Sequence, residues 1–75
     1  MNNILSETIQ VNSSMIKTAH YFKAQRELIL KFNNNKQYLY ENVPEGTYEG
    51  LRTAESKGQY LHRNVIKLFD FKPWN

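Results

Sequence analysis

Short runs in which apolar and polar residues alternate fill the first half of the chain, and a period of two is typical of β-strands. The clearest run covers residues 27–33, where Leu28, Leu30 and Phe32 lie on one face. The three asparagines at 33–35 predict a tight turn, because asparagine tolerates the left-handed backbone conformations that a hairpin needs.

Two similar runs flank this strand. Residues 15–22 alternate in the same way, and one face of that run carries Ile16, Thr18, His20 and Phe22. Residues 37–41 place Tyr38 and Tyr40 on a common face. Three consecutive short strands with tight connections predict an antiparallel meander.

The two ends of the chain carry weaker patterns. Residues 1–12 are polar and aperiodic except for the alternation of Ile9 and Val11, which indicates a short strand or a poorly structured lead-in. The C-terminal tail alternates and could add an edge strand that Pro73 would end. We therefore place a single domain over residues 13–75.

A helical period replaces the alternation after the third strand. Pro44 suits the first turn of a helix, where its missing N–H would have had no partner anyway. Tyr48 and Leu51 follow at helical spacing, and Gly58 is a natural helix terminator.

A second short helix is predicted over about residues 59–67, with Leu61, Val65 and Leu68 buried. The sequence thus predicts an α+β fold. In this fold a three-stranded antiparallel meander, with a possible fourth edge strand, packs against two short helices.

The composition limits which covalent links, metals and cofactors the chain can use. The chain has 75 residues, no cysteine and two histidines, so we expect no disulfide, no metal and no cofactor. A core of this size is close to the lower limit of independent stability. The small residues Gly46, Gly50 and Ala54 form a line that would admit another helix, for instance in a dimer. We therefore expect a homo-oligomer.

Charge and hydropathy bear on partners and location. Ten Lys and Arg residues against seven Asp and Glu give a net charge of +3, which suits an anionic partner but is also ordinary for solubility. No apolar run approaches the ~20 residues of a membrane span, so we expect no membrane partner. The first residues show no secretory signal, and we expect a cytoplasmic protein.

Two motifs stand out in the second half of the chain. They read Tyr38-x-Tyr40-x-x-Val43-Pro44 and Ser56-Lys57-Gly58-x-Tyr60. Together with the pattern of the strands, they resemble the KTSC domain family over residues 11–69. That family is a small module found after some bacterial lysyl-tRNA synthetases and as free-standing proteins, including phage proteins, which would act in the host cytoplasm. The resemblance implies an association with RNA. The chain departs from the family at Leu61-His62, where Phe-Asn is usual.

The second motif predicts a candidate anion site. A serine, a lysine and a glycine at a helix–helix junction can offer N–H groups and an ammonium, and Ser13-Ser14 could add hydroxyls for a phosphate. The same motif is equally consistent with a helix cap beside a solvated lysine. The residues expected to contact a ligand are Ser56, Lys57, Gly58, Tyr60, His62, Arg63, Asn64 and Lys67.

The tyrosines and histidines have more ordinary interpretations. The rings that could stack nucleobases are expected mainly to fill the core, because few other large residues are available; they are Tyr38, Tyr40, Tyr48 and Tyr60. His20 and His62 have no nucleophile or paired carboxylates in a catalytic order, so we expect no enzyme.

These features predict a non-enzymatic module that binds an anionic ligand, either RNA or a free nucleotide. A different class of function stays open, namely a phage-type accessory protein. Such a protein would inhibit a host protein, or form an oligomeric sponge for a nucleotide immune signal. An inhibitor would depend less on Lys57 than on exposed apolar residues such as Trp74.

Overall fold

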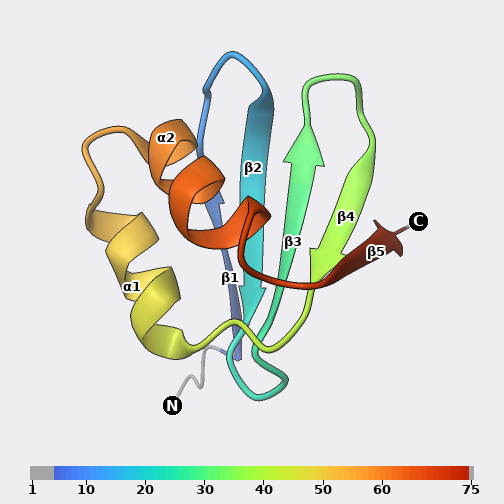
Figure 1. Ribbon diagram of the computed structural model, residues 1–75, viewed down its shortest axis with the longest axis vertical. Coiled ribbons are helices and arrows are strands. Elements are labelled where there is room, and N and C mark those ends of the chain that lie inside the picture. The colour runs from blue at the N-terminus through green and yellow to red at the C-terminus, as the bar shows by residue number, and fades with distance from the viewer. Residues whose placement is uncertain (1–4, 75) are drawn as a thin grey trace.

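The computed structural model describes residues 5–74 and shows a five-stranded antiparallel sheet with a helical layer on one face (Figure 1). The strands lie in the order in which they occur along the chain: β1 (Ser6–Gln10), β2 (Ile16–Phe22), β3 (Glu27–Phe32), β4 (Gln37–Tyr40) and β5 (Phe71–Trp74). Between β4 and β5 the chain forms α1 (Glu45–Thr53), α2 (Lys57–Leu61) and a π-helical turn, η1 (His62–Ile66). None of the helices in this part of the chain has the length and apolar character to cross a membrane.

The prediction of an α+β fold with two short helices is confirmed in kind, but the sheet has five strands rather than three or four. The strand that the prediction did not count is β1, which lies in the segment expected to be a lead-in or short strand. Residues 1–4 of that segment lie outside the described residues. β1 pairs with β2 from Ser6 opposite Phe22 to Gln10 opposite Thr18, and Ile9 is its one residue that packs against the core, so its apolar pattern is short.

The predicted edge strand is confirmed as β5, although Pro73 lies within it and does not end it. The N–H of Glu41 donates to the carbonyl of Asp70 at 3.0 Å. Because paired residues alternate in an antiparallel ladder, Pro73 opposite Tyr38 turns its backbone to the open side of the sheet. Its missing N–H therefore costs no ladder bond.

An irregularity in β2 changes which side chains share a face. The register with β3 shifts between Ile16 and Thr18. Ile16 therefore joins Ala19 and Tyr21 in the core, each with none of its surface exposed, while His20 lies on the opposite face. The prediction that Ile16 shares a face with His20 is wrong for this reason.

The core fills the space between the sheet and the helical layer. Tyr21 and Tyr48 stack with ring centroids 4.4 Å apart, and the Tyr21 hydroxyl donates to the carbonyl of Val43 at 2.6 Å. The buried residues of this cluster are Ile16, Ala19, Tyr21, Leu28, Leu30, Tyr40, Val43, Tyr48, Leu51, Leu61 and Val65. Of the four rings expected to fill the core, Tyr40 and Tyr48 are buried, whereas Tyr38 and Tyr60 are half-buried against it, and Tyr21 is the third buried tyrosine.

The second helix begins earlier than predicted. α1 ends at Thr53, and Ala54 is extended with φ −69° and ψ 139°. Gly58 therefore does not terminate the first helix but lies inside α2, which starts at Lys57. The predicted burial of Leu61 and Val65 is confirmed. Leu68 is 67% exposed, because it follows the end of η1, so its predicted burial is wrong.

The line of small residues on α1 serves the packing of the chain's own helices. A Cβ added at Gly50 would come within 2.2 Å of the Tyr60 hydroxyl oxygen, so glycine lets α2 approach α1. A Cβ added at Gly46 would meet nothing within 4 Å. The helix that approaches this line of small residues is therefore α2 of the same chain, and the pattern requires no second copy of the protein.

Candidate functional site

The junction between α1 and α2 draws together most of the residues expected to contact a ligand. Ser56 begins α2, and its hydroxyl accepts a hydrogen bond from the N–H of Gln59 at 3.4 Å. Gly58 follows in the first turn, and a Cβ added there would come within 2.7 Å of the Ser13 Cβ. This glycine therefore lets the loop between β1 and β2 lie directly against α2.

Two open depressions adjoin each other at this junction. One has a volume of about 270 Å³ and is lined by Ala54, Glu55, Ser56, Gln59, Tyr60, Arg63 and Asn64. The other has a volume of about 310 Å³ and is lined by Ser13, Ser14, Met15, Ser56, Gly58, Gln59 and His62. Because Ser56 and Gln59 line both, we treat the two depressions as one surface and call it the junction surface.

The first depression is shaped by fixed side chains around one free cation. The Tyr60 hydroxyl donates to the carbonyl of Thr47 at 2.8 Å, which holds the ring between the two helices. The Asn64 amide donates to the carbonyl of Tyr60 at 3.2 Å, at the point where α2 passes into the wider π-helical turn. Arg63 is exposed and forms no ion pair with any residue of 5–74.

Two of the expected contact residues lie outside both depressions. The Lys57 ammonium donates to the carbonyl of Ala54 at 3.1 Å, so it caps the C-terminal end of α1. This contact agrees with the alternative interpretation only for Lys57, a cation at the negative end of a helix, because Gly58 does not cap α1. Lys67 is exposed beyond the end of η1. The cation that lines the junction surface is therefore Arg63.

The sequence signal for the second depression was present but weak. The sequence predicts that the hydroxyls of Ser13 and Ser14 could bind a phosphate, and in the structure both residues line the same depression as His62. Gln59 and Glu55 were not among the expected contacts, because nothing local distinguishes them from other polar residues of a helix. His20 lies on the opposite face of the sheet, where its ring packs on Phe22 with centroids 4.6 Å apart.

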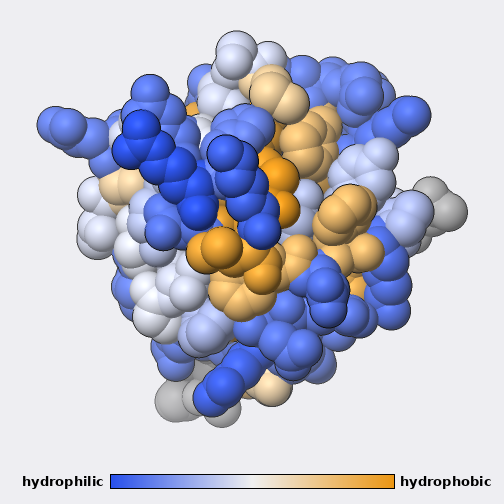
Figure 2. Space-filling model, viewed as in Figure 1, coloured by the Kyte–Doolittle hydropathy of each residue, from blue (hydrophilic) through white to orange (hydrophobic). Residues whose placement is uncertain are grey.

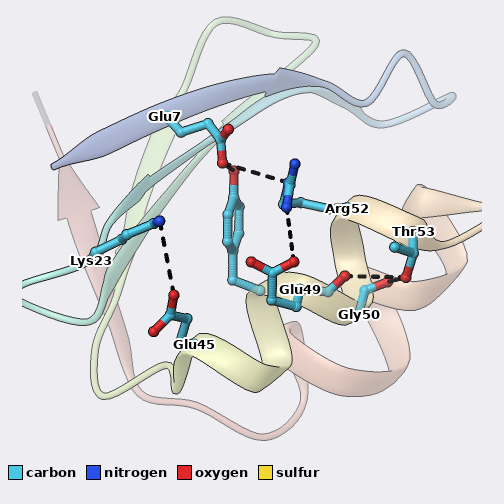
Figure 3. Close-up of polar contacts among 8 residues, drawn as sticks. Glu7, Lys23, Glu45, Glu49, Gly50, Arg52 and Thr53 are labelled. Atoms are coloured by element: carbon cyan, nitrogen blue, oxygen red, sulfur yellow. Dashed lines mark hydrogen bonds and ion pairs between the residues drawn. The ribbon is translucent and has the colours of Figure 1, made fainter. Parts of the chain in front are cut away.

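A second polar cluster joins β1 to α1 (Figure 3). The Tyr48 hydroxyl donates to a carboxylate oxygen of Glu7 at 2.7 Å, and the Arg52 Nε lies 3.6 Å from the same oxygen. Arg52 also pairs with Glu49 at 2.9 Å. Burial, reinforced by the hydrogen bond to Glu7, raises the pKa of Tyr48. This phenol is therefore protonated at neutral pH, and the cluster fastens an edge strand to a helix.

The other buried phenols behave in the same way. Burial raises the pKa of Tyr21 and that of Tyr40, so neither ring supplies a phenolate near neutral pH. Over residues 5–74, no group of three or more His, Asp or Glu side chains is arranged to hold a metal ion.

Sequence similarity to known proteins extends over most of the chain. The model of the KTSC domain family matches residues 12–69. A protein from Tsukamurella paurometabola is 38% identical over 57 residues, which cover 76% of this chain and 84% of that protein. A lysine–tRNA ligase from Nostoc sp. is 33% identical over 64 residues, and one from Trichormus variabilis is 31% identical over 64 residues. The matches cover 85% of this chain but 11% of each ligase.

The fold also matches a solved structure. The crystal structure of a KTSC domain protein from Yersinia pestis superposes with a TM-score of 0.83 at 26% sequence identity. The match covers 93% of this chain and 99% of the Yersinia protein, so the two share the whole architecture.

Proposed function

This chain belongs to the KTSC domain family, and on that premise we propose that it is a non-enzymatic module that binds single-stranded RNA through the junction surface. The observation that supports the proposal is that six of the eight residues expected to contact a ligand line this surface. Two relatives are parts of lysine–tRNA ligases, whose name includes an RNA substrate, and this supports RNA over other anions.

The chemistry of the junction surface suits a sugar–phosphate backbone. The exposed Arg63 guanidinium can donate two parallel hydrogen bonds to a phosphate. Gln59, Ser14 and Ser56 offer amide and hydroxyl groups, which can pair with the 2′-hydroxyl that distinguishes RNA from DNA. Glu55 is the single carboxylate among the lining residues, so donors predominate.

The shape of the junction surface favours a strand over a small molecule. Two open depressions that share a wall can receive successive nucleotides, whereas small-molecule sites usually enclose most of their ligand. The non-enzymatic part of the proposal rests on the surroundings of His62. The residues that line its depression include no carboxylate to orient the imidazole for acid–base work.

Fluorescence anisotropy with a labelled single-stranded RNA tests the proposal. Arg63→Gln should weaken binding and flatten the dependence of log affinity on log salt concentration by about 0.7, the effect of one lost phosphate contact on a single strand. The matched control is Lys23→Gln. It removes the same charge from the β2–β3 connection, at the opposite end of the sheet from the β1–β2 loop (Figure 1).

Two results would contradict the proposal. One is the absence of RNA binding by the wild-type protein at low salt. The other is equal binding by the Arg63→Gln and Lys23→Gln variants, which would mean that only net charge matters.

A second candidate function, binding of a protein, is favoured by an exposed apolar area next to η1. Leu68 is 67% exposed and Phe71 is 56% exposed. Figure 2 shows hydrophobic side chains gathered near the middle of the face that carries the helices. If this function dominates, a defined protein partner will bind the wild type and the Arg63→Gln variant but not a Leu68→Asp variant.

A further inference from the structure

A third depression lies apart from the α1–α2 junction, where the β3–β4 turn meets the end of β5. Its volume is about 410 Å³, and its lining residues are Asn35, Lys36, Gln37, Tyr38, Pro73 and Trp74. We propose that it is a nucleobase subsite of the RNA-binding surface, an inference that rests on the proposed function. The base would stack on the Trp74 indole, and the adjoining phosphate would pair with Lys36.

Strand pairing leaves one exposed ring at this depression, that of Trp74, on the face of the sheet opposite the Tyr38 ring. β4 and β5 pair Gln37 with Trp74 and Tyr38 with Pro73. The Tyr38 ring lies on the other face, edge-on to Phe32 and Phe71 with centroids 5.6 Å and 5.7 Å apart. Trp74 is 41% exposed, so its indole keeps free surface for a ligand.

The lining matches the three parts of a nucleotide. A nucleobase offers a flat π face, which stacks on aromatic side chains whatever its identity. Its edge carries amide-like donors and acceptors that the side chains of Asn35 and Gln37 complement. Its phosphate is anionic, and Lys36 is the one charged residue of the lining. An apolar peptide would instead leave these polar groups without partners.

The depression is tied to the junction surface by hydrogen bonds between two loops. The Asn33 amide donates to the carbonyls of Ser13 at 3.1 Å and Ser14 at 2.9 Å. The Lys17 ammonium donates to the Asn35 side-chain oxygen at 3.0 Å. Both loops lie at the same end of the sheet (Figure 1). A single strand that binds at the junction surface can therefore continue over these loops to the third depression.

Trp74 makes the inference directly measurable, because it is the one tryptophan of the chain. Single-stranded RNA should change its emission on binding. An oligonucleotide of equal length with abasic positions keeps its phosphates but lacks bases to stack, so it should bind more weakly and leave the emission nearly unchanged.

Substitutions separate stacking from folding. Trp74→Ala should weaken RNA binding roughly 5- to 150-fold, the range for one lost base–aromatic stack. Trp74→Phe keeps a ring and should restore most of the affinity, which a role in folding alone would not require. Lys36→Gln should flatten the salt dependence by about 0.7, while Lys23→Gln at the other end of the sheet should leave the emission response to RNA unchanged.

The outcomes distinguish this inference from the proposed function. If RNA binding requires Arg63 but Trp74→Ala binds like the wild type and Trp74 emission does not respond, the subsite is wrong and the proposed function stands. A free nucleoside monophosphate that changes the emission at lower concentration than RNA overturns the assignment to a polynucleotide. A response to a protein but not to RNA overturns it as well. If no RNA binds at all, both proposals fail.

Discussion

The hydroxyl of Tyr48 offers a quantitative test of how the edge strand is held. Tyr48 is 1% exposed, and its ring stacks on Tyr21 in the core. Its hydroxyl donates to Glu7 of β1 at 2.7 Å, across 41 positions of sequence. Tyr48→Phe removes this one contact while the ring and its packing remain.

The expected loss of stability follows from the surroundings of Glu7. A hydrogen bond to a charged group contributes about 1.5–3 kcal/mol to stability. The Glu7 side chain is 30% exposed and retains Arg52 at 3.6 Å, so its carboxylate is not left without partners. We therefore expect Tyr48→Phe to lower the free energy of unfolding by about 1.5–2 kcal/mol, at the lower end of that range. For a domain of this size, each kcal/mol corresponds to a fall in Tm of about 4–8 °C.

The assay is urea and thermal unfolding, followed by circular dichroism. Tyr38→Phe is the matched control, because within residues 5–74 its hydroxyl forms no hydrogen bond, and the variant should change stability by less than about 0.5 kcal/mol. Equal stability of Tyr48→Phe and wild type would refute the reasoning, since the contact would then contribute nothing net. A loss above about 3 kcal/mol would also refute it, because losses of that size are typical of a disrupted core.

Three further predictions concern packing and pH. Gly50→Ala should destabilise the protein by about 1–2 kcal/mol, because the new methyl group displaces the Tyr60 ring and its hydrogen bond. A Cβ at Gly46 would meet nothing within 4 Å, so Gly46→Ala should instead stabilise the protein by about 0.5 kcal/mol. Chemical unfolding of both variants measures the difference, and equal effects would contradict the assigned role of Gly50. Gly58→Ala should also be destabilising, since its methyl group would push the loop at Ser13 away from α2; unchanged thermal stability would show that the contact is soft. The raised pKa values of the buried tyrosines mean that the unfolded chain loses phenolic protons before the folded one. These phenols should therefore make stability fall as the pH rises above about 10, which unfolding at increasing pH will show. A flat profile there would contradict the assigned burial.

Local pattern was sufficient for the elements whose side chains face one consistent environment. The alternation of Leu28 and Leu30 identified β3, and the helical spacing of Tyr48 and Leu51 identified α1. The family motifs were also visible, because Val43-Pro44 and Ser56-Lys57-Gly58 lie where the two helices begin, at positions that particular residue types stabilise. In these segments the local preference and the final packing agree.

The local pattern did not predict a residue's environment where that environment depends on residues far away in sequence. The bulge in β2 turned Ile16 into the core and left His20 outside, which depends on the register with β3. β1 joined the sheet through backbone hydrogen bonds to β2, and these cannot be inferred from the side-chain pattern of residues 6–10. Gly58 lies inside α2, where the absence of a side chain leaves room for Ser13, although a glycine at that position is locally a helix terminator.

By itself the sequence determined the family, the α+β class and the tyrosine-rich core, because these depend on residue types and their periods. Only the tertiary structure decided which of the expected contacts share a surface. It committed Lys57 to the end of α1, left Arg63 free, and set the β1–β2 loop against α2. It also brought Trp74 beside Gln37 and the β3–β4 turn through the pairing of β4 and β5. The physical reason is that such surfaces arise from contacts between residues distant in sequence, and neither composition nor spacing records them.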